Sequence, residues 1–348
     1  MTQVPAAEIL RRQANFATHH LHTVPIVVLM AHSRCNCRCV MCDIWKANAT
    51  KRELSRDDLA SQIDSLRRLH VQRVVLSGGE ALMHSNLWLL CELIKELPAR
   101  ITLLSTGLLL KVHAADVVRW CDEVIVSLDG SRELHDAIRR IPSAFDRLAE
   151  GVAAVREHAP GYPVSGRCVL QRANFRDLPR IIDAAHTLGL DRISFMAVDV
   201  STTAFNRPVP WEAPRVAEVT LDAEETREFA ALVEDTIARY QADFDSGFVA
   251  ENPDKLRRLP RYFAALNGQG EFPPTVCNAP WISTVVEADG TVRPCFFHRA
   301  LGNIRTQSLE AILNGPEAVA FRRGLDVGTD PICRACVCTL QLGRRTPA

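Results

Sequence analysis

The sequence lacks the features that mark membrane-spanning, secreted and nucleic-acid-binding proteins. It contains no run of 18 apolar residues, so no stretch is long and apolar enough for a spanning helix. Its 41 basic and 41 acidic residues balance, and there is no basic excess to attract nucleic acid or an anionic membrane. Residues 1–22 show no charged-then-apolar signal pattern. We therefore expect a cytoplasmic protein that binds neither nucleic acid nor a membrane.

Cysteine, by contrast, is abundant and clustered. Nine of the twelve cysteines fall in two segments, residues 35–42 and residues 277–338. Disulfides are rare in cytosolic proteins, so clustered cysteines there indicate metal ligands or redox groups. Cys91 and Cys121 lie inside helical patterns and are expected to be buried core residues.

The strongest motif is C-x3-C-x2-C, formed by Cys35, Cys39 and Cys42. Three thiolates on one short loop can hold three irons of a [4Fe–4S] cube, which normally has four cysteine ligands. The fourth iron would then have an open position, and open positions are where metal sites do chemistry. Structural zinc is the alternative, but it usually takes four ligands in two separated pairs.

Strand and helix patterns alternate from residue 25 to residue 196, beginning with an apolar run typical of a strand covered on both faces. Six such units predict a parallel sheet with helices outside it, and the chemistry of such folds lies at the carboxyl ends of the strands. The cysteine motif follows the first of these strands. The expected strands are 25–30, 73–76, 101–104, 123–127, 164–171 and 192–196, and the expected helices are 55–69, 86–96, 112–120, 144–157 and 178–188.

Beyond residue 200 the pattern is less regular, and we expect the segment 201–274, with helices at 223–241 and 256–266, to shape a substrate pocket. A last module begins near Cys277, with strands at 281–287 and 291–295 joined by the turn Asp289-Gly290, and a short helix at 308–313. The predicted division is an N-terminal helical extension (1–23), a core (24–230), a linker and substrate-pocket region (231–275) and a C-terminal cysteine module (276–348).

The motifs together resemble the radical S-adenosylmethionine (radical SAM) superfamily. The resemblance rests on the cysteine motif after the first strand, followed by Gly78-Gly79-Glu80, Thr106-Gly107 and Ser127-Leu128-Asp129-Gly130 at later strand ends. It implies a partial (β/α)6 barrel of the TIM type. Met41 stands where the family usually has an aromatic residue, Ala81 where it often has proline, and no Asn precedes Gly107. By analogy Cys37 is not a ligand.

The resemblance also implies how the cofactor is held. Gly78, Gly79 and Glu80 would hold the amino group of S-adenosylmethionine, and Ser127 would lie near its ribose and carboxylate. For Asp129 a simple turn is the alternative. Four arginines could include a clamp for the carboxylate, with surface ion pairs as the alternative: Arg139, Arg140, Arg167 and Arg172.

The C-terminal cysteines are similar to the auxiliary-cluster modules called SPASM and, in a shortened form, twitch. The similarity rests on Cys277, on Gly290-x4-Cys295 and on Cys333-x2-Cys336. It implies one auxiliary [4Fe–4S] cluster on these four cysteines, with Cys338 able to replace Cys336. A structural zinc on the same residues is the alternative.

The resemblance implies reductive cleavage of S-adenosylmethionine and abstraction of a hydrogen atom from a substrate, with an external donor such as flavodoxin or ferredoxin. We expect oxidation of a carbinol in a small sugar- or aminocyclitol-like metabolite, because one auxiliary cluster can accept the second electron. Alternatives are an epimerase in which Cys168 donates hydrogen, although Cys168 could instead be a core residue, and a maturase of ribosomal peptides. A non-catalytic iron–sulfur or zinc scaffold or sensor is the alternative from another class.

Overall fold

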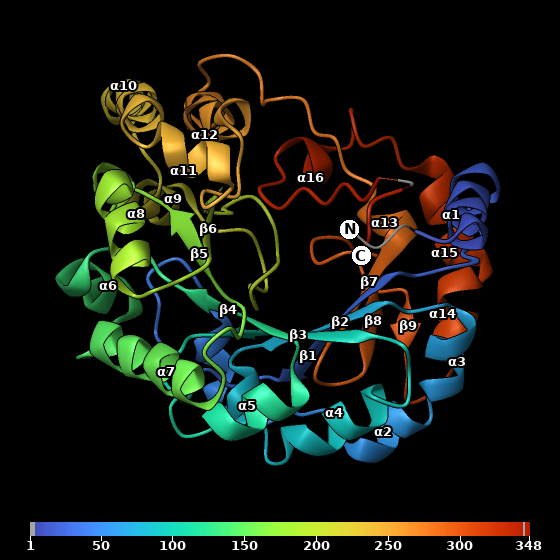
Figure 1. Cartoon of the computed structure of the whole chain (residues 1–348). Helices are drawn as coiled ribbons and strands as arrows, with labels where there is room; N and C mark the ends of the chain where they lie inside the picture. Colours follow the sequence, from blue (N-terminus) through green and yellow to red (C-terminus); the bar gives the residue numbers. More distant parts are fainter. Residues whose placement is uncertain (1–3, 344) are drawn as a thin grey trace.

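One curved sheet organises the chain, with most helices packed on its outer side (Figure 1). The computed structural model describes residues 4–343 and 345–348, and within them the strand order is β6-β5-β4-β3-β2-β1-β7-β8-β9. The first six strands are parallel neighbours in chain order, which confirms the predicted partial barrel of α/β class. The strands are β1 (Ile26–His32), β2 (Arg73–Gly78), β3 (Arg100–Ser105), β4 (Glu123–Ser127), β5 (Val164–Leu170), β6 (Arg192–Ala197), β7 (Ser283–Val286), β8 (Thr291–Arg293) and β9 (Gly302–Asn303).

The barrel helices begin near the predicted residues. Ser55 caps α2 through a capping box with Asp58, so the orphan amides of the first turn find partners. In this half of the chain, the short helix α6 was not predicted because it carries no long apolar stripe. The helices of the barrel half are α1 (Ala6–Thr18), α2 (Arg56–Ala60), α3 (Ile63–Arg68), α4 (Leu87–Ile94), α5 (Ala114–Trp120), α6 (Arg132–Arg139), α7 (Ala144–His158) and α8 (Leu178–Thr187), with 3-10 turns η1 (Ile44–Ala49), η2 (Ala81–Met83) and η3 (Phe175–Asp177).

Burial alternates along the barrel strands, and β1 is an example. Val27 and Leu29 are fully buried against the outer helices, whereas Ile26, Val28 and Met30 are half-buried. The expectation that β1 is covered on both faces is therefore only partly met. The reason is that the second face of β1 turns toward the hollow side of the curved sheet, where Met30 lines a cavity.

The predicted boundary between residues 230 and 231 falls inside α10 (Ala223–Arg239), a continuous helix. A division of the chain at that point would cut one secondary-structure element. The remaining helices are α9 (Ala213–Val219), α11 (Gln241–Ser246), α12 (Pro253–Leu266), α13 (Ala279–Ile282), α14 (Leu309–Asn314), α15 (Pro316–Gly324) and α16 (Pro331–Arg334).

The C-terminal module is joined to the barrel sheet. Strand β7 pairs in parallel with β1, and β8 returns antiparallel to β7. The turn between them is the predicted one, with Gly290 at φ 85° and Asp289 accepting a hydrogen bond from the Thr291 amide (3.1 Å). The strand expected from residue 281 begins only at Ser283, because Ala279–Ile282 form α13 with a proline in its first turn.

The N-terminal extension packs on this module, as Figure 1 shows for α1 beside α13. The buried amide of Asn15 donates to the carbonyl oxygens of Thr23 and Trp281 (2.7 Å each). The buried Arg12 guanidinium donates to the Gly343 oxygen (3.0 Å). Helix α1 therefore holds α13 and the segment at Gly343 together. None of the helices described here is long and apolar enough to cross a membrane.

Candidate functional site

The cysteine loop begins directly after β1 and ends at η1. Within it, backbone amides approach the cysteine sulfurs: the Cys37 amide lies 3.4 Å from Cys35 Sγ, and the Ile44 amide lies 3.5 Å from Cys42 Sγ. Such donors stabilise a thiolate or a metal–thiolate bond. Burial raises the pKa of the Cys42 thiol to about 12. Metal binding at this cysteine would therefore have to displace a proton.

A cavity of about 210 Å³ lies at the carboxyl ends of the strands and is lined by most of the predicted residues. The three cysteines and the ends of β2, β3, β4 and β6 all face this cavity. The sequence predicted such a meeting of strand-end residues. Glu80 is not among the lining residues. The predicted members of the lining are Cys35, Cys39, Cys42, Gly78, Gly79 and Ser127.

The two glycines are needed because the cysteine loop lies against them. A Cβ on Gly79 would come within 2.2 Å of the Arg34 oxygen, and one on Gly78, whose φ is 136°, within 2.4 Å of the His32 oxygen. The Gly79 amide donates to the His32 oxygen (2.8 Å) and the Glu80 amide to the Arg34 oxygen (2.9 Å). The glycines therefore allow the loop backbone itself to approach β2 closely.

Glu80 is buried and ties strand ends together. Its carboxylate accepts hydrogen bonds from the Leu82 amide (3.2 Å), the Ser105 hydroxyl (2.9 Å) and the Thr106 amide (2.6 Å). This carboxylate was expected to meet an ammonium group of the cofactor. In the structure it is instead already engaged with the end of β3 and the turn after it.

Arg139 is the arginine of the four candidates that lines the cavity. It lies at the end of α6, forms an ion pair with the fully buried Asp129, and its Nη1 lies 3.5 Å from Cys39 Sγ. Its Nε atom is buried without a partner among the described residues. Burial opposes its charge, but Asp129 and the loop cysteines outweigh that effect and raise the pKa of Arg139. Asp129 is thus more than a turn residue.

The other arginines are engaged elsewhere. Arg172 bonds Asp222 and Glu225 on the outside of the barrel. Arg167 approaches the Ser194 hydroxyl (3.4 Å), and Arg140 is exposed as the left-handed C-cap of α6. The arrangement therefore favours Arg139 alone as an anion partner in this cavity.

The segment after β6 covers the cysteine loop. Arg207 and Asp199 form a fully buried ion pair (2.7 Å), and Arg207 stacks 3.8 Å from the centre of the Trp211 ring. The Trp211 indole donates to Asp43 just beyond the loop (2.8 Å), and Arg215 donates to the Val40 oxygen. Residues 199–215 are thus the part of the irregular region nearest the site. The predicted pocket region 231–275 contributes Lys255, Arg258, Leu259, Tyr262 and Pro273 to a small cavity of about 60 Å³ beside Cys336.

A larger cavity of about 560 Å³ adjoins the first one. Its walls come from the end of β1, η1, the segment 203–208 and the β7–β8 hairpin with the residues after it. Ile44, Gly79 and Phe205 line both cavities. A molecule in the larger space would therefore lie next to one in the smaller space.

The C-terminal cysteines come from a segment that runs from residue 277 to residue 338. Burial raises the pKa of Cys333 and of Cys336, and the thiols of Cys277 and Cys295 add to both rises; Cys338 adds to the rise of the pKa of Cys295 and of Cys336. Burial raises the pKa of Cys295 to about 11, although the Phe297 and His298 amides oppose the rise. Val337, between Cys336 and Cys338, lines the cavity of the cysteine loop.

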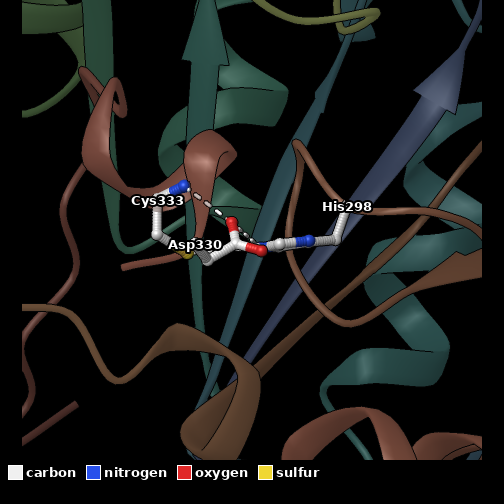
Figure 2. A group of neighbouring side chains, drawn as sticks. All are labelled: His298, Asp330 and Cys333. Carbon is white, nitrogen blue, oxygen red and sulfur yellow. Dashed lines mark hydrogen bonds and ion pairs between the residues drawn. The ribbon is translucent and has the colours of Figure 1, made fainter. Parts of the chain in front are cut away.

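His298 stands beside this group and was not singled out from the sequence. Figure 2 shows its ring directed at Cys333 and Asp330. Its Nε2 lies 3.3 Å from Cys333 Sγ and 3.9 Å from Asp330 Oδ1. In the described part of the chain, these residues form the one group of three candidate ligands whose atoms all lie within 4.8 Å of one another. The signal in the sequence was the spacing Cys295-x2-His298.

Cys168 is not in the cavity. It is fully buried, its Sγ lies 3.7 Å from Asn174 Nδ2, and burial strongly raises the pKa of its thiol. The next residue of β5, Val169, lines the cavity instead. Because successive strand residues face opposite sides, Cys168 points into the core, and the expectation that it could serve as a hydrogen donor is not supported.

Comparison with known proteins decides the family. A model of the Radical SAM superfamily matches residues 31–195, and a model of the SPASM iron–sulfur cluster-binding domain matches residues 277–337. The chain belongs to the radical SAM superfamily. Membership implies S-adenosylmethionine and a [4Fe–4S] cluster as cofactors, and the SPASM region implies an auxiliary cluster. The site fits these cofactors in two ways. The three loop thiols line one cavity, with backbone amides near two of their sulfurs, as a cluster needs. Among the described residues, Arg139 Nε has no partner and is free to meet an anionic group of S-adenosylmethionine.

The relatives include enzymes named as synthases of Fe-coproporphyrin III and of heme, a cyclase of the PqqA peptide and probable GTP 3′,8-cyclases. The Fe-coproporphyrin III synthase of Methanosarcina barkeri is 28% identical over 65% of this chain and 54% of its own length. The PqqA peptide cyclase of Ruegeria pomeroyi is 26% identical over 90% of this chain and 80% of its own length. The chain spans about half the length of several curated relatives, including 45% of an AdoMet-dependent heme synthase.

Solved structures share the fold. Streptococcus suis SuiB bound to its precursor peptide SuiA aligns with a TM-score of 0.63 and 16% identity, covering 92% of this chain and 72% of SuiB. The protein anSMEcpe with bound AdoMet aligns with a TM-score of 0.63 and 18% identity, covering 93% of this chain and 85% of anSMEcpe.

Proposed function

We propose that this radical SAM chain removes a hydrogen atom from a substrate held in the larger cavity and passes an electron to an auxiliary cluster. The observation that carries the proposal is the shared wall of the two cavities. Cys35, Cys39, Cys42 and the strand-end residues line the smaller one, and Ile44, Gly79 and Phe205 separate it from the larger one.

Cys35, Cys39 and Cys42 would hold the cluster, and Gly78, Gly79, Ser127 and Arg139 would hold S-adenosylmethionine. When bound, these groups supply a 5′-deoxyadenosyl radical that abstracts hydrogen, and the auxiliary cluster can take up the remaining electron. Arg139, kept in place by Asp129, would meet the cofactor carboxylate. The segment 199–215 would exclude water from above the loop.

Cys277, Cys295, Cys333 and Cys336 would hold the auxiliary cluster, with Cys338 as the alternative to Cys336. Val337 lines the smaller cavity, and Phe296, next to Cys295, lines the larger one, so the auxiliary cysteines would adjoin the space proposed for the substrate. An external donor such as flavodoxin or ferredoxin would reduce the first cluster.

Two substrate classes have support. Relatives that match most of this chain include a peptide cyclase and SuiB with its precursor peptide, which favours a peptide side chain. The number of C-terminal cysteines matches one auxiliary cluster, which favours oxidation of a carbinol in a small sugar- or aminocyclitol-like metabolite. The large cavity mixes charged and aromatic walls, among them Arg52, Arg293 and Phe296.

The experiment is anaerobic reconstitution, reduction and addition of S-adenosylmethionine, with 5′-deoxyadenosine as the readout. Release of 5′-deoxyadenosine supports the proposal. Absence of release, together with an unchanged electron paramagnetic resonance spectrum, would indicate a non-catalytic scaffold or sensor. Deuterated peptide and aminocyclitol candidates then separate the substrate classes, because only the true class transfers deuterium to 5′-deoxyadenosine.

A further inference from the structure

The C-terminal module holds one histidine directly against a cysteine sulfur. His298 Nε2 lies 3.3 Å from Cys333 Sγ, and the side chain is almost fully buried. Its ring packs edge-on against Phe321, with the ring centroids 4.9 Å apart. The backbone oxygen of His298 accepts a hydrogen bond from Arg293 (2.9 Å). Packing and backbone contacts therefore fix the position of the ring.

The distance between Nε2 and Sγ indicates how the two groups act. Ligands on different irons of one cube point toward different corners, so they lie farther apart than hydrogen-bonded atoms. A cysteine bound to iron is a thiolate and has no proton to donate. The hydrogen bond must then be donated by His298, from Nε2–H to the sulfur.

Asp330 supports the same geometry from the other side. Its Oδ1 accepts a hydrogen bond from the Cys333 amide (3.0 Å) as the N-cap of α16 and lies 3.9 Å from His298 Nε2 (Figure 2). The closer partner of Nε2 is thus the sulfur. A separate zinc or iron ion on His298, Asp330 and Cys333 would need Cys333 for itself, and the auxiliary cluster would then lose one of its four proposed ligands.

We propose that His298 is a positioning and tuning residue of the auxiliary cluster, donating a hydrogen bond to the Cys333 thiolate and raising the reduction potential of the cluster. This inference rests on the assignment of Cys333 to that cluster. Hydrogen bonds to cluster sulfurs stabilise the more negative, reduced state. A higher potential suits a cluster that accepts an electron from a substrate.

The test uses the full chain with Cys35, Cys39 and Cys42 replaced by alanine, so that only the auxiliary cluster remains. In this background, His298→Phe removes the donor and keeps a ring against Phe321, and His298→Gln restores an N–H group. His158→Phe, on the exposed end of α7, is the matched control. Iron and zinc content and the midpoint potential of the cluster are measured for each variant.

We expect about four irons per chain in every variant, a lower midpoint potential in His298→Phe, and a potential near the parent value in His298→Gln and His158→Phe. An unchanged potential in His298→Phe overturns the proposal. If only His298→Phe loses its irons, His298 is a ligand of the cluster. If the chain binds one zinc ion that depends on His298, then His298, Asp330 and Cys333 form a separate metal site. Either result also overturns the proposal. Absence of iron from the parent background shows instead that the auxiliary-cluster assignment itself is wrong.

Discussion

The two cysteine sites are built in opposite ways. The loop at residues 35–42 is local, and its backbone is pressed against the glycines at the end of β2. The C-terminal site gathers cysteines from residues 277–338, and its first strand, β7, is held between β1 and β8. A local site can be read from spacing, whereas a gathered site depends on tertiary contacts that spacing does not show. We therefore expect that a substitution that damages one of these sites leaves the other site intact.

The largest effect is expected from replacing Cys35, Cys39 and Cys42 together by alanine. Iron should fall from about eight to about four per chain, because one of two cubes loses its ligands. Release of 5′-deoxyadenosine should be abolished. Cys91→Ala, which removes a buried thiol in α4, is the control and should keep both values. Retained release in the triple variant would show that these cysteines do not hold the catalytic cluster.

Replacing Cys277 and Cys295 by alanine should produce the complementary defect. Iron should again fall to about four, but 5′-deoxyadenosine should still be released because the loop is untouched. Formation of the oxidised product should be lost, since the electron acceptor is missing. If the product still forms at the parent rate, the auxiliary cluster is not needed for the reaction.

Gly79→Ala should damage the first site alone. The added methyl group would press on the Arg34 backbone, and overpacking of this kind costs about 1–3 kcal/mol. We expect reduced iron at the loop cluster and a lower free energy of unfolding in a denaturant titration. Gly161→Ala, where a Cβ meets nothing within 4 Å, is the matched control. If Gly79→Ala and Gly161→Ala have the same free energy of unfolding and the same iron content, the close approach of the Arg34 backbone to Gly79 is contradicted.

Asn15→Ala should damage the second site alone. It leaves the buried carbonyls of Thr23 and Trp281 without their donor, at a cost of about 1–3 kcal/mol. Because Trp281 lies in α13, which begins two residues after Cys277, iron at the auxiliary cluster should fall while 5′-deoxyadenosine release persists. Loss of the loop cluster instead would show that the two sites are not independent.

Cys168→Ala should have the smallest effect. The thiol lies in the core beside Asn174, so its loss should cost about 1 kcal/mol in the free energy of unfolding. The yield and stereochemistry of the product should not change. Loss of an epimerised product while 5′-deoxyadenosine release continues would restore Cys168 as a hydrogen donor and would require the strand to face the other way.

Part of this arrangement was predictable and part was not. The six strands, the parallel sheet and the position of Cys35 to Cys42 at a strand end followed from apolar runs and from the rule that strand ends meet at one edge, and the partial barrel followed from the family resemblance. Nothing local to residues 279–286 indicates that β7 pairs with β1, because parallel pairing between distant strands leaves no local pattern. The buried role of Glu80 and the contact between His298 and Cys333 depend on side-chain directions, which only the folded chain defines.

The central claim is that one cluster has an open iron for S-adenosylmethionine and the other is closed by protein ligands. The direct test is the electron paramagnetic resonance spectrum of two reduced variants, one lacking Cys277 and Cys295 and one lacking the three loop cysteines, before and after addition of S-adenosylmethionine. The account predicts a changed spectrum in the first variant and an unchanged spectrum in the second. A change in the variant that lacks the loop cysteines would contradict it.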